Sequence, residues 1–139
     1  MHQLKFTTVW YDDFNLEVIV EASNDSFSGK VELLLPYEKC FQMIDELQDF
    51  PKSQSDEVKF FSGDDFTHST LGLHFYSRDS LGNPSILVSL QQKETQSPKN
   101  EINRTALVVH CDPQGIKNFR DQLRGLLTGK RTTASLEMI

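Results

Sequence analysis

The stretch Asn15-Leu16-Glu17-Val18-Ile19-Val20-Glu21-Ala22-Ser23 decides the fold of this chain. Every second residue in it is apolar, and two glutamates occupy positions between them, a period of two that is typical of a strand with one buried face. It predicts a strand over residues 14–22. Because residues 23–26 favour a tight turn and the alternation resumes over 27–35, the two segments are expected to form a hairpin.

Shorter apolar runs predict further strands on both sides of this hairpin. A weaker strand over residues 4–8 precedes it. Four more strands follow, marked by Val58 and Phe60, by Leu71, Leu73 and Phe75, by Ile86, Val88 and Leu90, and by Leu107 and Val109. Residues 91–103 are polar throughout and are predicted to form a mobile hairpin loop, since nothing in them offsets the entropy of ordering.

Two segments have helical spacing instead. Pro36 suits the first turn of a helix predicted over residues 37–49, whose apolar positions include Phe41, Ile44 and Leu47. Asp112-Pro113 predicts the start of a second helix, with Asp112 as N-cap. Its apolar stripe comprises Ile116, Phe119, Leu123, Leu126 and Leu127, and Gly129 is a plausible end.

The element order β-β-β-α-β-β-β-β-α predicts an α+β fold in a single domain over residues 1–129. We expect one antiparallel sheet of about six to seven strands with both helices packed on one face. Residues 130–139 have no periodicity and are expected to be either disordered or docked through Leu136, Met138 and Ile139. The predicted core comprises Leu16, Val18, Val20, Val31, Leu33, Leu73, Phe75, Ile86 and Val88, packed against Phe41, Ile44, Leu47, Phe119 and Leu123.

Composition and charge argue against several classes of function. The chain of 139 residues carries a formal charge of −6, which argues against nonspecific binding to nucleic acid or to anionic membranes. The sequence has neither a secretory leader nor a run of about 20 apolar residues, so a cytoplasmic protein is expected. Cys40 and Cys111 lack metal-ligand spacing and are interpreted as small core residues. Neither a metal nor a cofactor is predicted.

Two polar clusters are candidate sites. Trp10, Tyr11, Asp12 and Asp13 combine aromatic and acidic side chains, a composition found at recognition hot spots. The simpler interpretation, that Trp10 fills the core and the aspartates solvate a turn, is favoured. Asp64, Asp65 and His68 could ligate a divalent ion or form an acid–base pair, although turn-forming aspartates in a solvated loop are the commoner case. No catalytic residue is assigned.

The opposite face of the predicted sheet is too apolar to be fully wetted. Strand alternation assigns to it Ile19, Leu34, His74, Tyr76, Leu87 and Val108. A symmetric dimer, the docked tail or a foreign partner could cover this face, and a homodimer is the favoured cover.

Three segments together resemble a family of small uncharacterised bacterial proteins. They are residues 10–18 with Trp10-x-Asp12-Asp13, residues 21–29 with Ala-Ser-Asn and Phe-Ser-Gly, and residues 47–51 ending in Phe50-Pro51. The similarity extends through residues 79–83 and the final helix. It implies a bacterial, stand-alone domain and transfers no catalytic residue.

The sequence therefore predicts a non-enzymatic protein-binding module. Residues 1–65 hold 14 acidic and 5 basic side chains, and an acidic surface would attract a partner with a basic surface. An immunity protein that neutralises a toxin is one concrete form. The alternative is a small enzyme or ligand-binding protein with its site around Asp64, Asp65 and His68.

Overall fold

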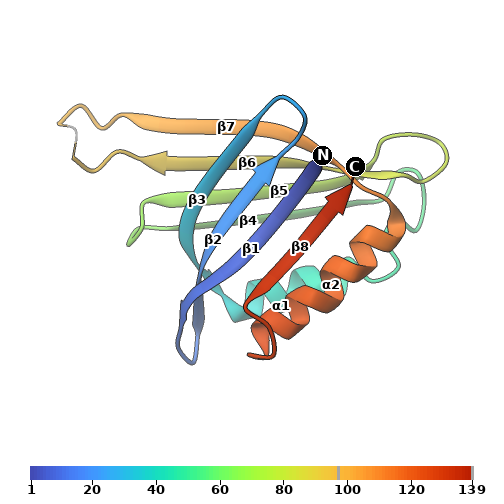
Figure 1. Cartoon of the computed structure of the whole chain (residues 1–139), viewed down its shortest axis with the longest axis horizontal. Coiled ribbons are helices and arrows are strands. Elements are labelled where there is room, and N and C mark those ends of the chain that lie inside the picture. Colours follow the sequence, from blue (N-terminus) through green and yellow to red (C-terminus); the bar gives the residue numbers. More distant parts are fainter. Residues whose placement is uncertain (97, 139) are drawn as a thin grey trace.

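A computed structural model describes residues 1–96 and 98–138 (Figure 1). In chain order its elements are β1 (His2–Tyr11), β2 (Asn15–Ser23), β3 (Ser28–Pro36), α1 (Tyr37–Glu46), β4 (Glu57–Asp64), β5 (Ser69–Ser77), β6 (Pro84–Lys93), β7 (Ile102–His110), α2 (Pro113–Leu127) and β8 (Thr133–Met138). The protein is α+β with antiparallel sheets, as predicted. No helix in the described ranges is long and apolar enough to cross a membrane.

The strands form two sheets of four strands each, so the prediction of a single sheet of six to seven strands is wrong. The first sheet has the order β3-β2-β1-β8 and the second the order β4-β5-β6-β7. Figure 1 shows the strands of the first sheet crossing those of the second obliquely. Because a strand that buries one face shows the same alternation in either architecture, the sequence pattern does not distinguish one sheet from two.

The C-terminal segment is the edge strand of the first sheet. β8 pairs antiparallel with β1, placing Leu136 opposite Leu4 and Ala134 opposite Phe6. Leu136 and Ala134 are both buried. The expected docking of Ile139 falls outside the described residues. This six-residue strand has only two buried positions, too few for the alternation to be recognised in sequence.

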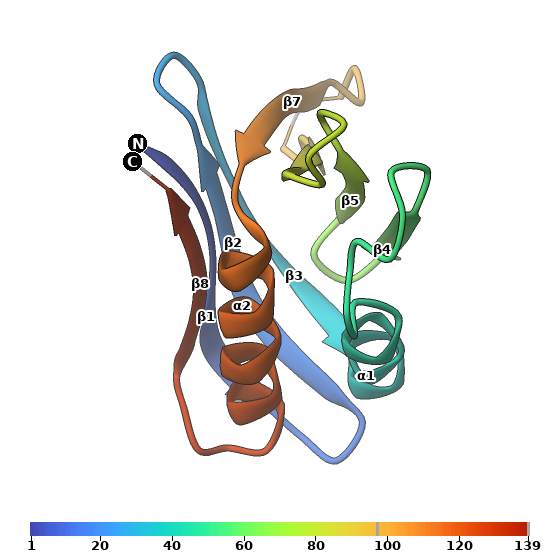
Figure 2. The same cartoon turned by 90° about the vertical axis from the view of Figure 1, so that its right-hand side faces the viewer.

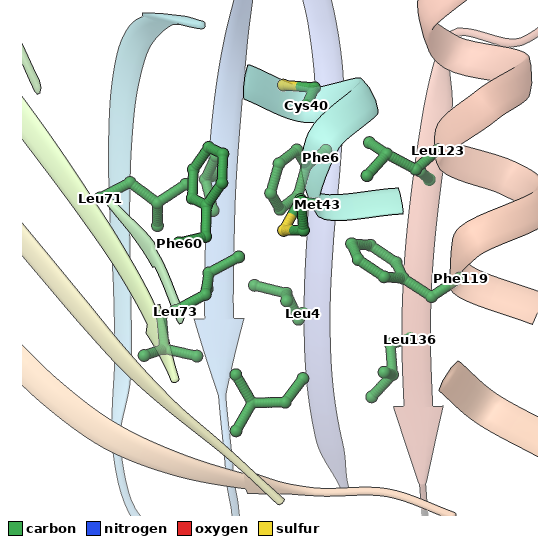
Figure 3. Close-up of a cluster of buried hydrophobic side chains, with 14 of the residues drawn as sticks. Leu4, Phe6, Cys40, Met43, Phe60, Leu71, Leu73, Phe119, Leu123 and Leu136 are labelled. Atoms are coloured by element: carbon green, nitrogen blue, oxygen red, sulfur yellow. The ribbon is translucent and has the colours of Figure 1, made fainter. Parts of the chain in front are cut away.

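The core lies between the inner faces of the two sheets and the helices (Figures 2 and 3). Figure 2 shows α2 lying alongside β8 and β1, with α1 below the second sheet. The predicted core residues are buried except Phe41. Because Phe41 is 38% exposed, its assignment to the core is wrong. The buried stripe of α1 is formed by Cys40, Met43, Ile44 and Leu47, and Phe41 lies beside it.

The predicted bounds of α2 are confirmed by its caps. The Asp112 side chain accepts a hydrogen bond from the Gly115 N–H at 2.7 Å. At the other end Gly129 has φ of 76°, and the Lys130 N–H donates to the Gly125 carbonyl, which is a Schellman ending. α1 ends at Glu46, earlier than predicted.

The predicted loop over residues 91–103 is also corrected. Strand pairing continues through Gln91 opposite Arg104 and Lys93 opposite Ile102, so the ends of this segment belong to β6 and β7. Backbone hydrogen bonding across the hairpin orders polar residues that bury little apolar surface.

Candidate functional site

The hairpin between β1 and β2 presents aromatic side chains to solvent. The exposed fractions are 51% for Trp10, 68% for Tyr11 and 78% for Phe14. The interpretation of Trp10 as a core residue is therefore wrong. Three exposed aromatic rings within five consecutive residues form a candidate recognition surface, which we call the aromatic hairpin (Trp10, Tyr11 and Phe14).

A β-bulge explains why Trp10 faces outward. Thr8 pairs with Val18 but Trp10 pairs with Glu17, so Val9 is an extra residue in β1. Without this insertion Trp10 would share the inward face with Leu4 and Phe6, because residues of the same parity share a face. The bulge moves it to the outer face beside Glu17. Nothing in the local sequence marks the bulge.

A cleft of about 710 Å³ opens beside the aromatic hairpin. One wall comes from β1, β2 and their turn and includes Tyr11, Asp12 and Asp13. The other comes from the end of α2 and the following loop, and Tyr37 of α1 also lines it. The remaining lining residues are Thr8, Leu16, Leu126, Leu127, Thr128, Gly129, Arg131 and Thr132.

The two aspartates of the turn have different roles. The Asp12 carboxylate accepts hydrogen bonds from the backbone N–H groups of Phe14 and Asn15 at 2.8 and 2.7 Å. Asp12 therefore stabilises the turn, as the simpler interpretation holds. Asp13 is exposed at the cleft.

Negative charge dominates this cleft. Burial raises the pKa of the Tyr37 hydroxyl, and the charges of Asp12 and Asp13 and the nearby Tyr11 raise it further. The C-terminal end of α2 adds partial negative charge at Leu126 and Leu127.

Arg131 is the lining residue of opposite charge, and its guanidinium is already engaged. It donates to the Thr133 carbonyl at 3.0 Å and to the Gln122 side chain at 3.4 Å. Asp12 and Asp13 outnumber this one guanidinium, so the cleft lining is net negative and suits a cationic group lying against aromatic rings. Its described lining includes neither histidine nor cysteine.

The members of the second candidate cluster share the turn between β4 and β5, where backbone N–H groups engage the Asp64 carboxylate. The Asp64 carboxylate accepts hydrogen bonds from the N–H groups of Phe66 and Thr67 at 2.7 and 2.8 Å, and from the Leu34 N–H at 2.8 Å. Burial opposes ionisation, but these hydrogen bonds hold the pKa of Asp64 below its usual value.

Asp65 and His68 are exposed in the same turn, and neither lines the cleft beside the aromatic hairpin. Among the described residues no group of three or more His, Cys, Asp or Glu side chains could hold a metal ion.

The six residues assigned to one apolar face belong to two separate sheets. Ile19 and Leu34 lie on the first sheet, and they are half-buried. His74, Tyr76, Leu87 and Val108 lie on the second sheet. His74, Leu87 and Val108 are cross-strand neighbours on its outer face. The common face was inferred from the prediction of a single sheet. Because the strands form two sheets, that inference is corrected as well.

Sequence reasoning missed Tyr37 and Arg131. Phe14 directly follows the cluster Trp10 to Asp13 and belongs to the same aromatic and acidic run. Tyr37 and Arg131 come from distant segments, and only the pairing of β8 with β1 and the packing of α2 bring Arg131 to the cleft. No signal in the sequence indicates that convergence.

The sequence matches no known protein-family model and no curated protein. The candidate site therefore stands on its own geometry.

Proposed function

We propose that this protein is a non-enzymatic module that binds another protein through the aromatic hairpin and the adjoining cleft. The observation that carries the proposal is the exposure of Trp10, Tyr11 and Phe14 on one hairpin, from which Tyr11 and Asp13 also line the cleft. Exposed aromatic side chains offer large apolar areas at small entropic cost and are enriched at binding hot spots.

Charge indicates the kind of partner. The carboxylates of Asp12 and Asp13 and the end of α2 favour a lysine or arginine side chain, which could lie against the Tyr11 and Tyr37 rings. A basic partner would also be attracted at long range by the chain's net charge of −6. We therefore propose a partner with a basic surface and no role in binding nucleic acid.

An immunity-type protein that blocks a toxin is the concrete form we favour. Such a role requires a complementary surface and no reacting group, which suits a cleft lined by Tyr, Asp and aliphatic residues. We also propose a bacterial protein acting in the cytoplasm. Cys40 and Cys111 support that compartment, since both are free and buried.

Affinity capture with matched variants tests this function. Wild type and Trp10→Ala/Asp13→Asn are used to capture proteins from a bacterial lysate, and any protein recovered is purified and titrated against each. Phe66→Ala is the control, because Phe66 is 80% exposed on a different hairpin, between β4 and β5.

The expected result is a partner whose affinity falls at least about tenfold with the hairpin variant, remains unchanged with Phe66→Ala, and weakens as salt is added. A partner that binds both variants as tightly as wild type would contradict the proposed surface. Failure to recover any partner from a lysate of the protein's own source would contradict the binding function.

A further inference from the structure

Side chains cap individual backbone groups on the edge strands of this fold. On the first sheet, Asp64 accepts from the Leu34 N–H of β3, and Gln122 accepts from the Ser135 N–H of β8. On β4 of the second sheet, Lys39 donates to the Phe61 carbonyl. Open edges invite pairing with other chains, and such capping blocks it.

The edge of β7 is closed along only part of its length. Asn24 donates to the Val108 carbonyl at 3.0 Å, and His2 accepts from the His110 N–H at 3.0 Å. These bonds identify the even-numbered residues of β7 as those whose backbone groups point away from β6. Ile102, Arg104 and Ala106 have the same parity, and all three are exposed.

We call residues 102–106 the open edge. Figure 1 shows this part of β7 projecting past the point where the β2–β3 hairpin crosses the sheet. Within the described ranges, no cap comparable to Asn24 or His2 faces its outward backbone groups. It is a template for one additional strand.

An apolar hollow adjoins the open edge on the outer face of the second sheet. It measures about 410 Å³, and its floor follows the row Phe61, Gly72, Ser89 and Ala106, which are cross-strand neighbours. Because Gly72, Ser89 and Ala106 have small side chains, the surface of the sheet is depressed along this part of the row. Because Ala106 belongs to the edge strand, the hollow can be reached from the side.

The register of an added strand determines which side chains meet these features. A residue directly opposite Ala106 would have its side chain on the outer face, and an apolar side chain there could reach over Ala106 into the hollow. In an antiparallel strand, the residue two positions further along lies opposite Arg104. Arg104 is exposed and forms no ion pair with a described residue, so it favours a carboxylate at that position.

A second copy of this chain fits the open edge poorly. The antiparallel register that pairs the whole stretch 102–106 with its own copy places Arg104 opposite itself, and like charges directly opposite each other are destabilising. A foreign strand with an acidic residue avoids this repulsion.

We propose that the open edge of β7 binds an extended segment of another protein by β-strand addition, with an apolar residue over the hollow and an acidic residue against Arg104. This surface is separate from the aromatic hairpin, and its chemistry is opposite in charge.

A capped seven-residue peptide rich in threonine, with leucine third and glutamate fifth, tests the proposal. The comparison peptide has lysine in place of glutamate. Ala106→Pro removes one outward N–H without touching the β6–β7 ladder, a change that edge strands tolerate. Ala106→Ser is the matched control because it keeps that N–H, and circular dichroism confirms that both variants fold.

Binding is followed by NMR titration and by amide exchange. We expect the glutamate peptide to slow exchange at Arg104 and Ala106, and Ala106→Pro to weaken its binding about tenfold or more while Ala106→Ser leaves it within about threefold. Arg104→Glu should reverse the preference in favour of the lysine peptide. Trp10→Ala should bind like wild type, which separates this surface from the proposed function.

Three outcomes overturn the proposal. The first is the absence of any change in the Arg104 and Ala106 amides at millimolar peptide. The second is equal binding by Ala106→Pro and Ala106→Ser. The third is protection of these amides that rises with protein concentration alone, together with sedimentation as a dimer. That result would assign the open edge to a second copy.

Discussion

The carboxylate of Asp64, at the end of β4, accepts a hydrogen bond of 2.8 Å from the backbone N–H of Leu34 on β3. The bond joins the second sheet to the edge of the first. The Asp64 carboxylate also accepts hydrogen bonds from the N–H groups of Phe66 and Thr67, so it stabilises both the β4–β5 turn and the junction between the sheets.

Asp64→Ala should therefore destabilise the fold. The N–H groups of Leu34, Phe66 and Thr67 would lose their acceptor, and a partly buried unsatisfied donor costs about 1–3 kcal/mol. Urea unfolding measures the change. Asp65→Ala is the control and should alter the unfolding free energy by less than about 0.5 kcal/mol, because Asp65 is exposed. Equal losses of unfolding free energy in Asp64→Ala and Asp65→Ala would contradict the role of Asp64 in joining the two sheets.

The same junction should weaken in acid. The pKa of Asp64 is lowered in the folded state from its ordinary value of 3.8, so its contribution is complete well above that pH and is lost as the pH falls through the folded pKa. Asp64→Asn has no such titration. The difference in unfolding free energy between wild type and Asp64→Asn should therefore shrink below pH 3.8. If the difference in unfolding free energy between wild type and Asp64→Asn stays constant as the pH falls, protonation of Asp64 does not contribute to the acid sensitivity.

The packing of α2 is the central apolar contact of the fold. The Phe6 and Phe119 rings meet edge to face with centroids 5.7 Å apart, and both side chains are fully buried (Figure 3). Phe119→Ala should cost about 3–5 kcal/mol. Phe41→Ala should cost much less, since Phe41 is 38% exposed. Similar losses for the two variants would show that α2 does not dock centrally.

The sequence predicted the elements of this fold better than their assembly. The alternation of residues 16–22 and the stripe Ile116 to Leu127 correspond to β2 and α2 because burial acts on each residue locally. The division into two sheets depends on which edges pair. That choice is made by long-range contacts such as Asp64 with Leu34, which leave no period in the sequence.

The candidate site was predicted in its residues and misjudged in its exposure. Trp10 and Tyr11 were identified by their composition, yet the favoured interpretation placed Trp10 in the core. One extra residue, Val9, reverses the face on which Trp10 lies. The cleft could not be predicted, because Tyr37 and Arg131 reach it only through the tertiary arrangement.

Trp10→Ala provides a stability test of that reversal. Truncation of a buried Trp costs about 3–5 kcal/mol. Because Trp10 is 51% exposed on the outer face, we expect a loss of about 1 kcal/mol or less in urea unfolding. Leu16→Ala serves as the comparison within the same hairpin, since Leu16 is buried, and should cost about 2–5 kcal/mol. A loss for Trp10→Ala that matches Leu16→Ala would place the ring in the core and remove it from the recognition surface.

Near neutral pH, stability should depend on the two histidines that join β1 to β7. The His2 and His110 rings stack with centroids 4.9 Å apart, and the Ser85 hydroxyl lies 2.7 Å from Nδ1 of His110. Burial lowers the pKa of His110 from 6.5, and the nearby charges of Arg78 and His2 lower it further. As pH falls below 6.5, the unfolded chain takes up a proton that the folded chain resists.

The free energy of unfolding should therefore decline as the pH falls from 6.5 through the lowered pKa of His110. His110→Gln lacks this titration, so its stability should change less over the same range, although it is expected to be less stable than wild type at higher pH. His68→Gln is the control, because His68 is exposed in the β4–β5 turn and should keep the wild-type slope. Urea unfolding across this range, combined with an NMR titration of the His110 ring, measures both quantities. If His110→Gln and wild type lose stability in parallel, the acid sensitivity arises elsewhere in the protein.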